Sequence, residues 1–272
     1  MTERQELERW TPREIHTYHF SPKKSVFLGS VLIKDVPGTL SMAAATVAGL
    51  GLNLVESNSS RIDSSGLAEW GFFAESDETH ISASDLESKL KRTPNVIDCT
   101  VRGAEGSVLV DTLHYPLQVT PGAQAILVRK DVFSSMLKFV VETYGSAGKT
   151  LAYQLGKATG ESDGKDLVKE MGPERVLENL AELTNLYVAQ GWGISDLVDL
   201  SFNPLTATIR LRGSFECSGR TSMVPVSNFI RGHLAGLAKA FFNKNVECVE
   251  TMCVAKGDPY CEITCTETVF SR

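Results

Sequence analysis

The order of apolar segments between residues 26 and 101 is the feature that most constrains how this chain can fold. Four short stretches rich in β-branched and aromatic residues have the length and composition of strands. These stretches are residues 26–33, 53–62, 67–74 and 96–101. Between the first two and between the last two, apolar residues recur at helical spacing, in residues 40–50 and 86–90. The chain therefore predicts the order strand, helix, strand, strand, helix, strand.

Turn and cap signals agree with this order. Gly51 ends the first predicted helix, and the Ser-Ser-Gly sequence at 64–66 predicts a hairpin turn between the second and third strands. Ser84 and Glu87 have the spacing of a capping box, in which each side chain accepts a hydrogen bond from the backbone of the other. We therefore expect the second helix to begin at Ser84.

Two short motifs in this half resemble the ACT domain over roughly residues 25–103: Asp-x-Pro-Gly-x-Leu at 35–40 and Gly-Leu-Asn at 51–53. The resemblance implies a ferredoxin-like βαββαβ module that usually dimerises and binds amino acids or similar effectors at the first strand-to-helix turn. Helix N–H groups after Gly38 suit a carboxylate, and Asp35 with Asn53 suits an ammonium or amide group. The predicted effector-binding residues are Asp35, Gly38, Leu40 and Asn53. Alternatively, this turn binds nothing and is only tight.

Longer helical segments begin at about residue 108, which predicts a second domain over 108–270 and leaves 1–24 as an N-terminal extension. Predicted helices begin at Asp131 and Lys149 and span about residues 173–190 and 226–242. Predicted strands are residues 110–119, 125–128, 194–200, 206–212 and 246–252, with a last one from Ile263. The whole chain is therefore expected to be α+β, with two domains.

A cysteine pair, Cys253 and Cys261, flanks a Gly-Asp-Pro turn between the last two strand-like segments. Two thiols at the neck of a hairpin can chelate a soft metal ion or form a disulfide. Glu250 and Cys253 differ in strand parity, so their side chains converge only if the strand bulges or ends near Met252. The pair therefore predicts an anchored site whose third member depends on a strand irregularity.

Two other interpretations of the cysteines stay open. The first treats Cys248 and Cys265 as small buried hydrophobic residues and the hairpin pair as free thiols, because reducing compartments disfavour structural disulfides. The second lets the hairpin pair close reversibly and switch the domain by oxidation.

The second half resembles the 4-vinyl-reductase-like domain over about residues 108–270. The motifs that carry the resemblance are Gly-Ser-Phe-Glu at 213–216, Gly-His-Leu-Ala-Gly-Leu at 232–237, and Glu-x-x-Cys-x7-Cys at 250–261. It implies a mixed α/β domain with an antiparallel sheet and several helices. Members include sensor domains of aromatic-responsive regulators, archaeal redox regulators and an accessory protein of bacteriochlorophyll synthesis. The fold is also similar to that of a TRAPP trafficking component, so fold alone does not fix function.

The same resemblance implies a zinc site. In the sensor members the ligands are a cysteine at the start of the last helix, a glutamate and the spaced cysteine pair. Carried over, these are Glu250, Cys253 and Cys261, while the fourth position falls on Ser227, whose hydroxyl is a poor zinc ligand. Either Cys217 replaces the missing thiolate or water completes the shell. The predicted metal residues are therefore Cys217, Glu250, Cys253 and Cys261.

A hydrophobic-ligand pocket is expected near the last helix. Its predicted lining is Tyr153, Trp192, Phe229 and His233, although each of these residue types also serves as ordinary core packing. Small residues form a stripe on the same helix, which lets another backbone or a flat ligand approach closely. The stripe consists of Gly232, Ala235, Gly236 and Ala240.

Composition excludes several classes of function. The net charge of −6 argues against a broad phosphate-binding surface, so we expect no direct contact with nucleic acid. The segment 145–150 ends like a P-loop but lacks its first glycine, and no dinucleotide fingerprint follows a strand, so no nucleotide cofactor is expected. No apolar run is long enough to span a bilayer and the first residues are polar, which predicts a cytoplasmic protein.

These inferences predict a small-molecule-responsive regulatory protein. We expect a homodimer that binds an amino-acid-like effector, a hydrophobic aromatic ligand or both, uses structural zinc, and signals through an unknown downstream protein. Binding is expected in place of turnover, and no catalytic residue is assigned. One alternative is an enzyme or accessory protein for an aromatic or tetrapyrrole-like substrate, with water at an open zinc position. The other is an adaptor without a small ligand.

Overall fold

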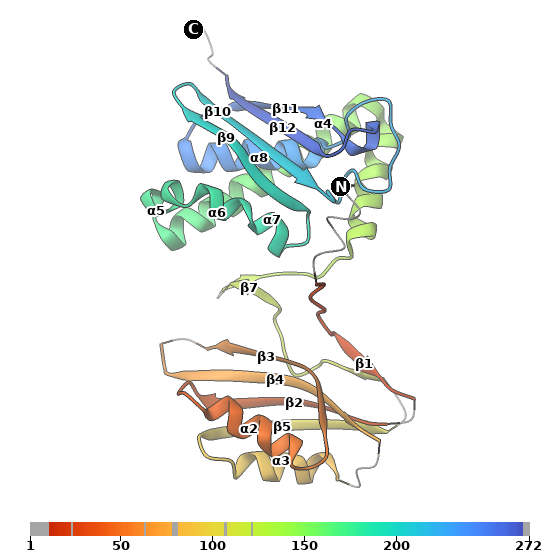
Figure 1. Cartoon of the computed structure of the whole chain (residues 1–272), viewed down its shortest axis with the longest axis vertical. Coiled ribbons are helices and arrows are strands. Elements are labelled where there is room, and N and C mark those ends of the chain that lie inside the picture. Colours follow the sequence, from red (N-terminus) through yellow and green to blue (C-terminus); the bar gives the residue numbers. More distant parts are fainter. Residues whose placement is uncertain are drawn as a thin grey trace. The chain divides into compact units, whose positions relative to one another are not determined.

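The computed structural model describes residues 11–22, 24–62, 64–77, 81–105, 108–120 and 122–268 of the chain (Figure 1). The chain divides into two compact units, one of residues 12–126 and the other of residues 127–272 together with 1–11. Each unit has a hydrophobic core of its own. Within the described ranges, every helix is too short or too polar to cross a membrane.

The N-terminal unit is built on the predicted order of strands and helices. Its elements are β2 (Ser25–Lys34), α2 (Thr39–Ala48), β3 (Asn53–Arg61), β4 (Leu67–Ser76), α3 (Ala83–Lys91) and β5 (Val96–Glu105). The four strands form one antiparallel sheet in the order β3-β4-β2-β5, and both helices cover the same face (Figure 1). The predicted ferredoxin-like βαββαβ fold class is confirmed.

Successive side chains of the central strand β2 point to opposite faces of the sheet, and apolar residues lie on both faces. Phe27, Val31 and Ile33 belong to the core under the helices, together with Trp70 and Leu86. The intervening residues Val26 and Leu28 pack on the opposite face with Phe73 and Leu109. A strand that is buried on both sides is expected to be a continuous apolar run, which is the pattern of residues 26–33.

The segment that packs on this second face differs from the prediction in one domain boundary and in two strands. The segment 108–126, which we assigned to the second domain, groups with the N-terminal unit. Its strand β6 (Val108–Val110) pairs antiparallel with β1 (Tyr18–Phe20), and Leu109 is buried against the sheet. In place of strands at 110–119 and 125–128, the chain forms a small hairpin of β7 (Gln118–Thr120) and β8 (Ala123–Gln124). The turn residues predicted a hairpin. However, apolar and polar residues alternate too weakly in this segment to define which residues of the two strands pair.

The start of α3 differs from the prediction by two residues. Ser82 is the N-cap: its hydroxyl accepts a hydrogen bond from the Asp85 N–H, and the Asp85 carboxylate accepts one from the Ser82 N–H. The predicted box of Ser84 and Glu87 is therefore wrong. Glu87 instead accepts from the Val101 N–H of strand β5. Both serines have an acidic residue three positions later, so spacing alone did not distinguish them.

The C-terminal unit combines a second antiparallel sheet with several helices. Its helices are α4 (Lys130–Met171), α5 (Pro173–Glu178), α6 (Leu180–Thr184), α7 (Leu186–Ala189), α8 (Asn228–Phe242) and the short η1 (Val254–Lys256). Its strands are β9 (Ile194–Phe202), β10 (Leu205–Arg212), β11 (Val246–Met252) and β12 (Cys261–Glu267), ordered β11-β12-β10-β9. Helix α8 lies along one face of this sheet (Figure 1).

Helix boundaries before β9 differ from those predicted. The two helices expected from Asp131 and from Lys149 are both present: they are the two parts of α4 and join at a kink at Gly145, where the backbone is not helical (φ 55°, ψ −124°). Only glycine adopts that φ without strain, so the break lies at the residue that permits it. The helix expected over 173–190 is divided into α5, α6 and α7 at Asn179 and Asn185.

Helices α4 and α8 touch backbone to backbone. A Cβ atom added to Gly156 or Gly160 of α4 would lie 2.0 Å from the carbonyl oxygen of Phe229 or His233, respectively. Reciprocally, a Cβ atom on Gly232 of α8 would lie 2.0 Å from the Tyr153 carbonyl oxygen. The stripe of small residues on α8 therefore packs against the backbone of α4. Close approach of another backbone was one of the two possibilities that the sequence left open.

A disulfide joins β11, at the edge of the sheet, to β12, the other strand of the last hairpin. Cys248 and Cys265 lie directly opposite each other on β11 and β12, and their sulfur atoms are bonded. Our interpretation of these two cysteines as small hydrophobic residues is therefore wrong. It relied on compartment, whereas the strand register places both side chains on one face at the same level.

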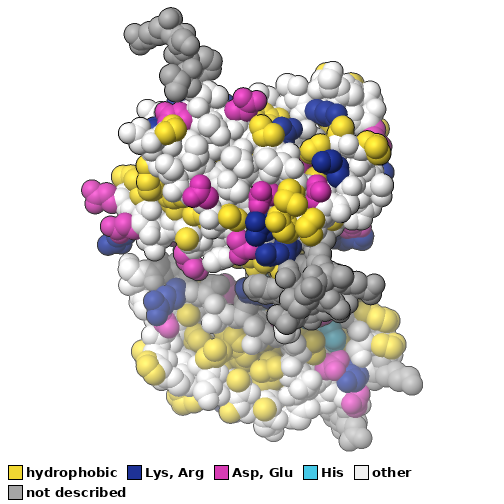
Figure 2. All heavy atoms as spheres, turned by 45° about the horizontal axis from the view of Figure 1, so that its top comes forward, with side chains coloured by type: hydrophobic (Ala, Val, Ile, Leu, Met, Phe, Trp, Pro, Cys, Tyr) yellow, Lys and Arg dark blue, Asp and Glu magenta, His cyan; other side chains and the backbone are white. Residues whose placement is uncertain are grey.

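The charged surface mixes both signs. On the face shown in Figure 2, lysine and arginine side chains are interspersed with aspartate and glutamate side chains and with apolar groups.

We expect Gly156→Ala to destabilise the C-terminal unit. The added methyl group must displace the backbone of α8, which should cost about 2–4 kcal/mol of unfolding free energy even after the gain in helix propensity. Chemical denaturation followed by circular dichroism measures the loss. Gln154→Ala, on the exposed side of the same helix, is the matched control and should change stability by less than about 0.5 kcal/mol. Equal stability of the two variants would contradict the close contact.

We expect the paired substitution Cys248→Ser with Cys265→Ser to lower stability only under oxidising conditions. The bond closes a loop with a sequence separation of 17, for which a contribution of about 3 kcal/mol is typical. Unfolding curves with and without a dithiol reductant test this, because reduction should bring the parent protein toward the variant. A parent protein whose stability ignores the reductant would contradict the bond.

Candidate functional site

An apolar cavity lies between helix α8, the segment α5 to α7 and one face of the second sheet. Its volume is about 110 Å³. Helical lining residues include Leu180, Leu183, Leu186, Leu234 and Phe241, and sheet residues include Leu197, Leu205, Ile209 and Cys265. An engineered cavity of roughly 150 Å³ with similar aliphatic and aromatic walls binds benzene, so this volume has the scale of one small ring.

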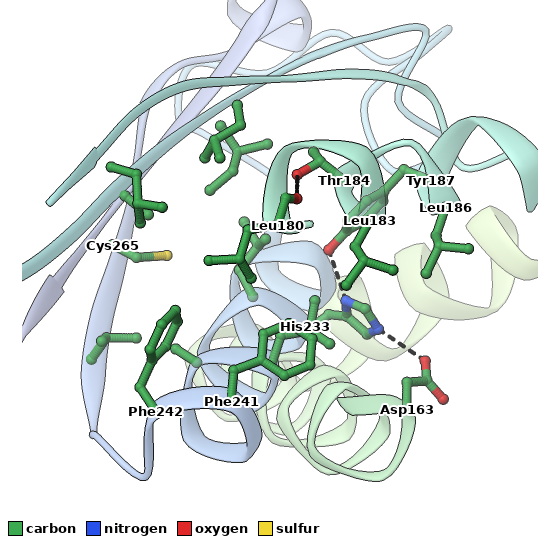
Figure 3. Close-up of a pocket in the computed structure, with 18 of the residues that line it drawn as sticks. Asp163, Leu180, Leu183, Thr184, Leu186, Tyr187, His233, Phe241, Phe242 and Cys265 are labelled. Atoms are coloured by element: carbon green, nitrogen blue, oxygen red, sulfur yellow. Dashed lines mark hydrogen bonds and ion pairs between the residues drawn. The ribbon is translucent and has the colours of Figure 1, made fainter. Parts of the chain in front are cut away.

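One corner of the cavity is polar. The Tyr187 hydroxyl lies 2.7 Å from His233 Nδ1, and His233 Nε2 lies 3.1 Å from Asp163 Oδ2 (Figure 3). Tyr187 and His233 are buried, whereas the Asp163 side chain is 43% exposed. Burial raises the pKa of Tyr187 well above its usual range, so its hydroxyl stays protonated. The chain of three side chains therefore connects solvent to the cavity wall.

Three elements that are distant in sequence supply this corner. Tyr187 comes from α7, His233 from α8 and Asp163 from α4. Trp192 packs edge-on against His233 and Tyr187, which fixes both rings. Close contact between α4 and α8 brings the aspartate within reach of the imidazole. The corner is thus positioned by packing of rigid elements and not by a loop.

The four predicted pocket residues have different places. His233 lines the cavity. Trp192 and Phe229 lie in an aromatic cluster with Phe215, where ring centroids are 5.4–6.0 Å apart, and they are not among the lining residues. Tyr153 faces a separate open groove that also includes Arg231. Trp192 and Phe229 therefore have the ordinary packing role that the sequence left open as an alternative.

The predicted metal residues converge. One ligand atom from each of Cys217, Glu250, Cys253 and Cys261 lies within 4.8 Å of the others, and all four residues are buried. The strand register shifts between Glu250 and Met252, so the bulge that the parity argument required is present. Asp258 holds the tip of the hairpin by accepting a hydrogen bond from the Cys253 N–H at 2.7 Å.

The donor set fits a thiophilic metal ion. Tetrahedral coordination with metal–sulfur bonds of about 2.3 Å separates two sulfur ligands by roughly 3.8 Å. Cys217 Sγ and Cys253 Sγ are 3.8 Å apart, and Cys217 Sγ is 3.7 Å from a Glu250 carboxylate oxygen. Burial raises the pKa of Glu250 to about 7, because a carboxylate among thiols and away from water lacks a compensating charge. A divalent cation would supply that charge.

Ser227 takes a supporting place beside these four residues. Its backbone N–H and its hydroxyl both donate to the Glu250 carboxylate, at 2.8 and 2.7 Å. Cys217 Sγ lies 3.0 Å from the Ser227 hydroxyl oxygen. Of the two sequence alternatives for the fourth ligand, the arrangement favours Cys217, whose sulfur reaches the cluster from the loop before α8.

Glu216 is a buried carboxylate that the sequence analysis did not select. It accepts hydrogen bonds from the N–H groups of Phe229 and Ile230 at the start of α8, at 2.9 and 3.0 Å. Its pKa is raised to about 7 by burial. Through this residue the loop that carries Cys217 is fastened to the helix that carries His233. A glutamate within a conspicuous Gly-Ser-Phe-Glu motif was the available signal.

The predicted effector residues do not all come together. Asp35 forms an ion pair with Arg61, Gly38 has a φ of 89° before helix α2, and Leu40 is exposed. Asn53 pairs with Glu75, which itself pairs with Val26, whereas Asp35 follows the other end of β2. Nine residues of extended strand separate these levels by roughly 30 Å. Within one chain, Asn53 therefore cannot join Asp35 around a small effector.

Comparison with known proteins identifies part of the C-terminal unit. Residues 207–267 match the family described as V4R domain, a range that includes all four predicted metal residues and His233. The chain therefore contains a C-terminal V4R domain, as the 4-vinyl-reductase resemblance implied. No curated protein matches the sequence.

Several solved structures are similar to this chain at low identity. The phenol-responsive sensory domain of the transcription activator PoxR with phenol is 18% identical, over 60% of this chain and 81% of the other (TM-score 0.45). A vinyl-4-reductase family protein from Methanocaldococcus jannaschii is 16% identical, over 53% and 85% (TM-score 0.37). Trafficking protein particle complex subunit 3 from Naegleria fowleri, covalently bound to palmitic acid, is 14% identical, over 53% and 97% (TM-score 0.40).

Proposed function

We propose that the C-terminal unit is a small-molecule sensor module that binds a hydrophobic ligand of about one ring in the cavity beneath α8. The observation that carries the proposal is the combination of apolar walls with a single hydrogen-bonding corner. Ligand sites of this kind obtain affinity from apolar burial and orientation from a few polar groups. Membership of the matched segment in the V4R family supports the same assignment.

We further propose that Cys217, Glu250, Cys253 and Cys261 hold one structural zinc ion, with Ser227 orienting the glutamate. Bound zinc would crosslink the loop before α8 to the hairpin of β11 and β12. The sulfur-rich donor set and its burial support zinc over magnesium or calcium, which prefer oxygen ligands.

For the N-terminal unit we propose an ACT-like regulatory role in a homodimer that acts through a protein partner. The ferredoxin-like order supports this assignment. Any effector contact near Asp35, Gly38 and Leu40 must use groups other than Asn53 of the same chain, because the sheet register separates them.

Small aromatic compounds should stabilise the C-terminal unit. At a ligand concentration near 100 times Kd the expected gain is about 2.7 kcal/mol, which raises Tm by several degrees. Differential scanning calorimetry with benzene, toluene and phenol measures it. Leu183→Trp, which fills the cavity, should abolish the shift, whereas Leu177→Trp on the exposed side of α5 should keep it. No shift with any compound would favour the adaptor alternative.

Protein purified under reducing conditions should contain about one zinc ion per chain. Removal of a thiolate ligand by Cys217→Ser should lower metal content and affinity by at least tenfold, measured by mass spectrometry of the metal and competition with a chelator. Cys99→Ser removes another buried free thiol, in the N-terminal unit, and should leave zinc unchanged. Full zinc affinity in the Cys217 variant would refute its assignment as a ligand.

A further inference from the structure

A second hollow of the C-terminal unit has no role in the functions proposed above. It is an open groove of about 510 Å³ between α4, the start of α8 and strand β11. Tyr153 and Lys157 of α4, Arg231 of α8 and residues 245–248 line it. Val246 also lines the apolar cavity, so the two hollows are neighbours that share a wall residue.

The Arg231 guanidinium is held in the groove by uncharged oxygen atoms. Its Nε donates to the Ser227 carbonyl at 3.2 Å, and its terminal nitrogens donate to the Cys248 carbonyl at 3.4 Å and to Asn228 Oδ1 at 2.9 Å. A guanidinium has five N–H groups, so two remain free of these bonds. None of the ion pairs among the described residues includes Arg231. Its position is therefore fixed, and its charge has no counter-ion there.

Two more hydrogen-bond donors line the same groove. Lys157 lies one helical turn after Tyr153 on α4, so both side chains are on the same side of that helix. Within the described part of the chain, neither the Lys157 ammonium nor the Tyr153 hydroxyl has a hydrogen-bond partner. The Arg231 guanidinium lies 5.9 Å from the centre of the Tyr153 ring. Burial raises the pKa of Tyr153, so its hydroxyl stays protonated and can donate.

The neighbouring carboxylates are directed elsewhere. Glu247 alternates along β11 with the buried Val246 and Cys248, so its exposed side chain points to the opposite face of the sheet. Glu161, one turn further along α4, forms an ion pair with Lys165. The groove therefore has an excess of positive charge and of donors.

The start of α8 does not add a phosphate site to this groove. Glu216 accepts hydrogen bonds from the N–H groups of Phe229 and Ile230 at that helix end. Phosphate sites typically use several free backbone N–H groups at a helix N-terminus. A planar carboxylate, in contrast, is matched by paired N–H groups of one guanidinium. The donors that face the groove therefore favour a carboxylate over a phosphate group.

We propose that this groove binds an organic carboxylate with an apolar body, at a site separate from the aromatic cavity. The carboxylate accepts hydrogen bonds from Arg231, Lys157 and Tyr153, and the apolar body lies against the Tyr153 ring and Val246. Because the groove is several times larger than the cavity, it admits acids of more than one ring. An arginine that is already fixed loses little side-chain freedom on binding, which favours affinity.

Isothermal titration calorimetry of the full chain at pH 7.5 tests the proposal. The probe is 2-naphthoate, because its two rings do not fit a cavity that has the scale of one ring. The uncharged analogue 2-naphthalenemethanol has a similar shape and serves as the comparison. Since the two compounds differ in their cost of leaving water, the informative quantity is how each affinity changes on substitution.

Substitutions of the two cations separate recognition of the carboxylate from general structure. Lys157→Gln removes a charge without breaking a bond of the described chain, and should weaken naphthoate binding about threefold to tenfold while the alcohol changes by less than about twofold. Arg231→Lys keeps the charge but loses the paired N–H groups, and should weaken naphthoate binding similarly. Lys169→Gln, an exposed lysine about three turns along the same helix, is the control and should change neither affinity.

Leu183→Trp distinguishes the groove from the aromatic cavity. This variant fills the cavity and should leave naphthoate binding intact. Loss of naphthoate binding in Leu183→Trp would place the acid in the cavity and overturn the proposal. Equal naphthoate affinity of the parent protein, Lys157→Gln and Lys169→Gln would also overturn it, as would absence of binding at millimolar concentration. Because the proposed function concerns the other cavity, either proposal can fail while the other holds.

Discussion

Helices α4 and α8 meet where glycine faces peptide backbone, and the rest of the C-terminal unit is arranged around that contact. Gly156 and Gly160 leave no room for a methyl group between the two helix axes. Such closeness brings Asp163 of one helix beside His233 of the other. A larger residue at the crossing would separate the axes and move Asp163 away from His233.

The cluster of Cys217, Glu250, Cys253 and Cys261 depends on a different kind of irregularity. In a regular strand, Glu250 and Cys253 would point to opposite faces, and the bulge after Glu250 removes that conflict. Ser227 then holds the carboxylate through two hydrogen bonds, while Cys217 supplies sulfur from the preceding loop. The serine therefore orients the carboxylate, and the loop cysteine adds a third sulfur to the cluster.

Structure could be predicted most accurately from the sequence where apolar residues followed one clear periodicity. The apolar run of β2 and the spaced leucines of α3 led to the correct order of the N-terminal unit, and parity with turn chemistry led to the bulged hairpin. Capping was wrong at α3 because two serines satisfy the same rule. The polar corner was missed as a unit, since its contacts join residues 46 and 70 positions apart, and a single sequence carries no signal for such pairs. His233 was selected only as an aromatic residue.

The disulfide between Cys248 and Cys265 also depends on the correct alignment of the two strands. Four of the six cysteines lie on or beside the last hairpin, and four thiols can pair in three ways. Only the native alignment of β11 with β12 sets these two opposite each other; a slip by one residue would place Cys248 across from a threonine. Formation of this bond therefore selects the correctly paired hairpin, because the two cysteines do not meet when the strands are misaligned.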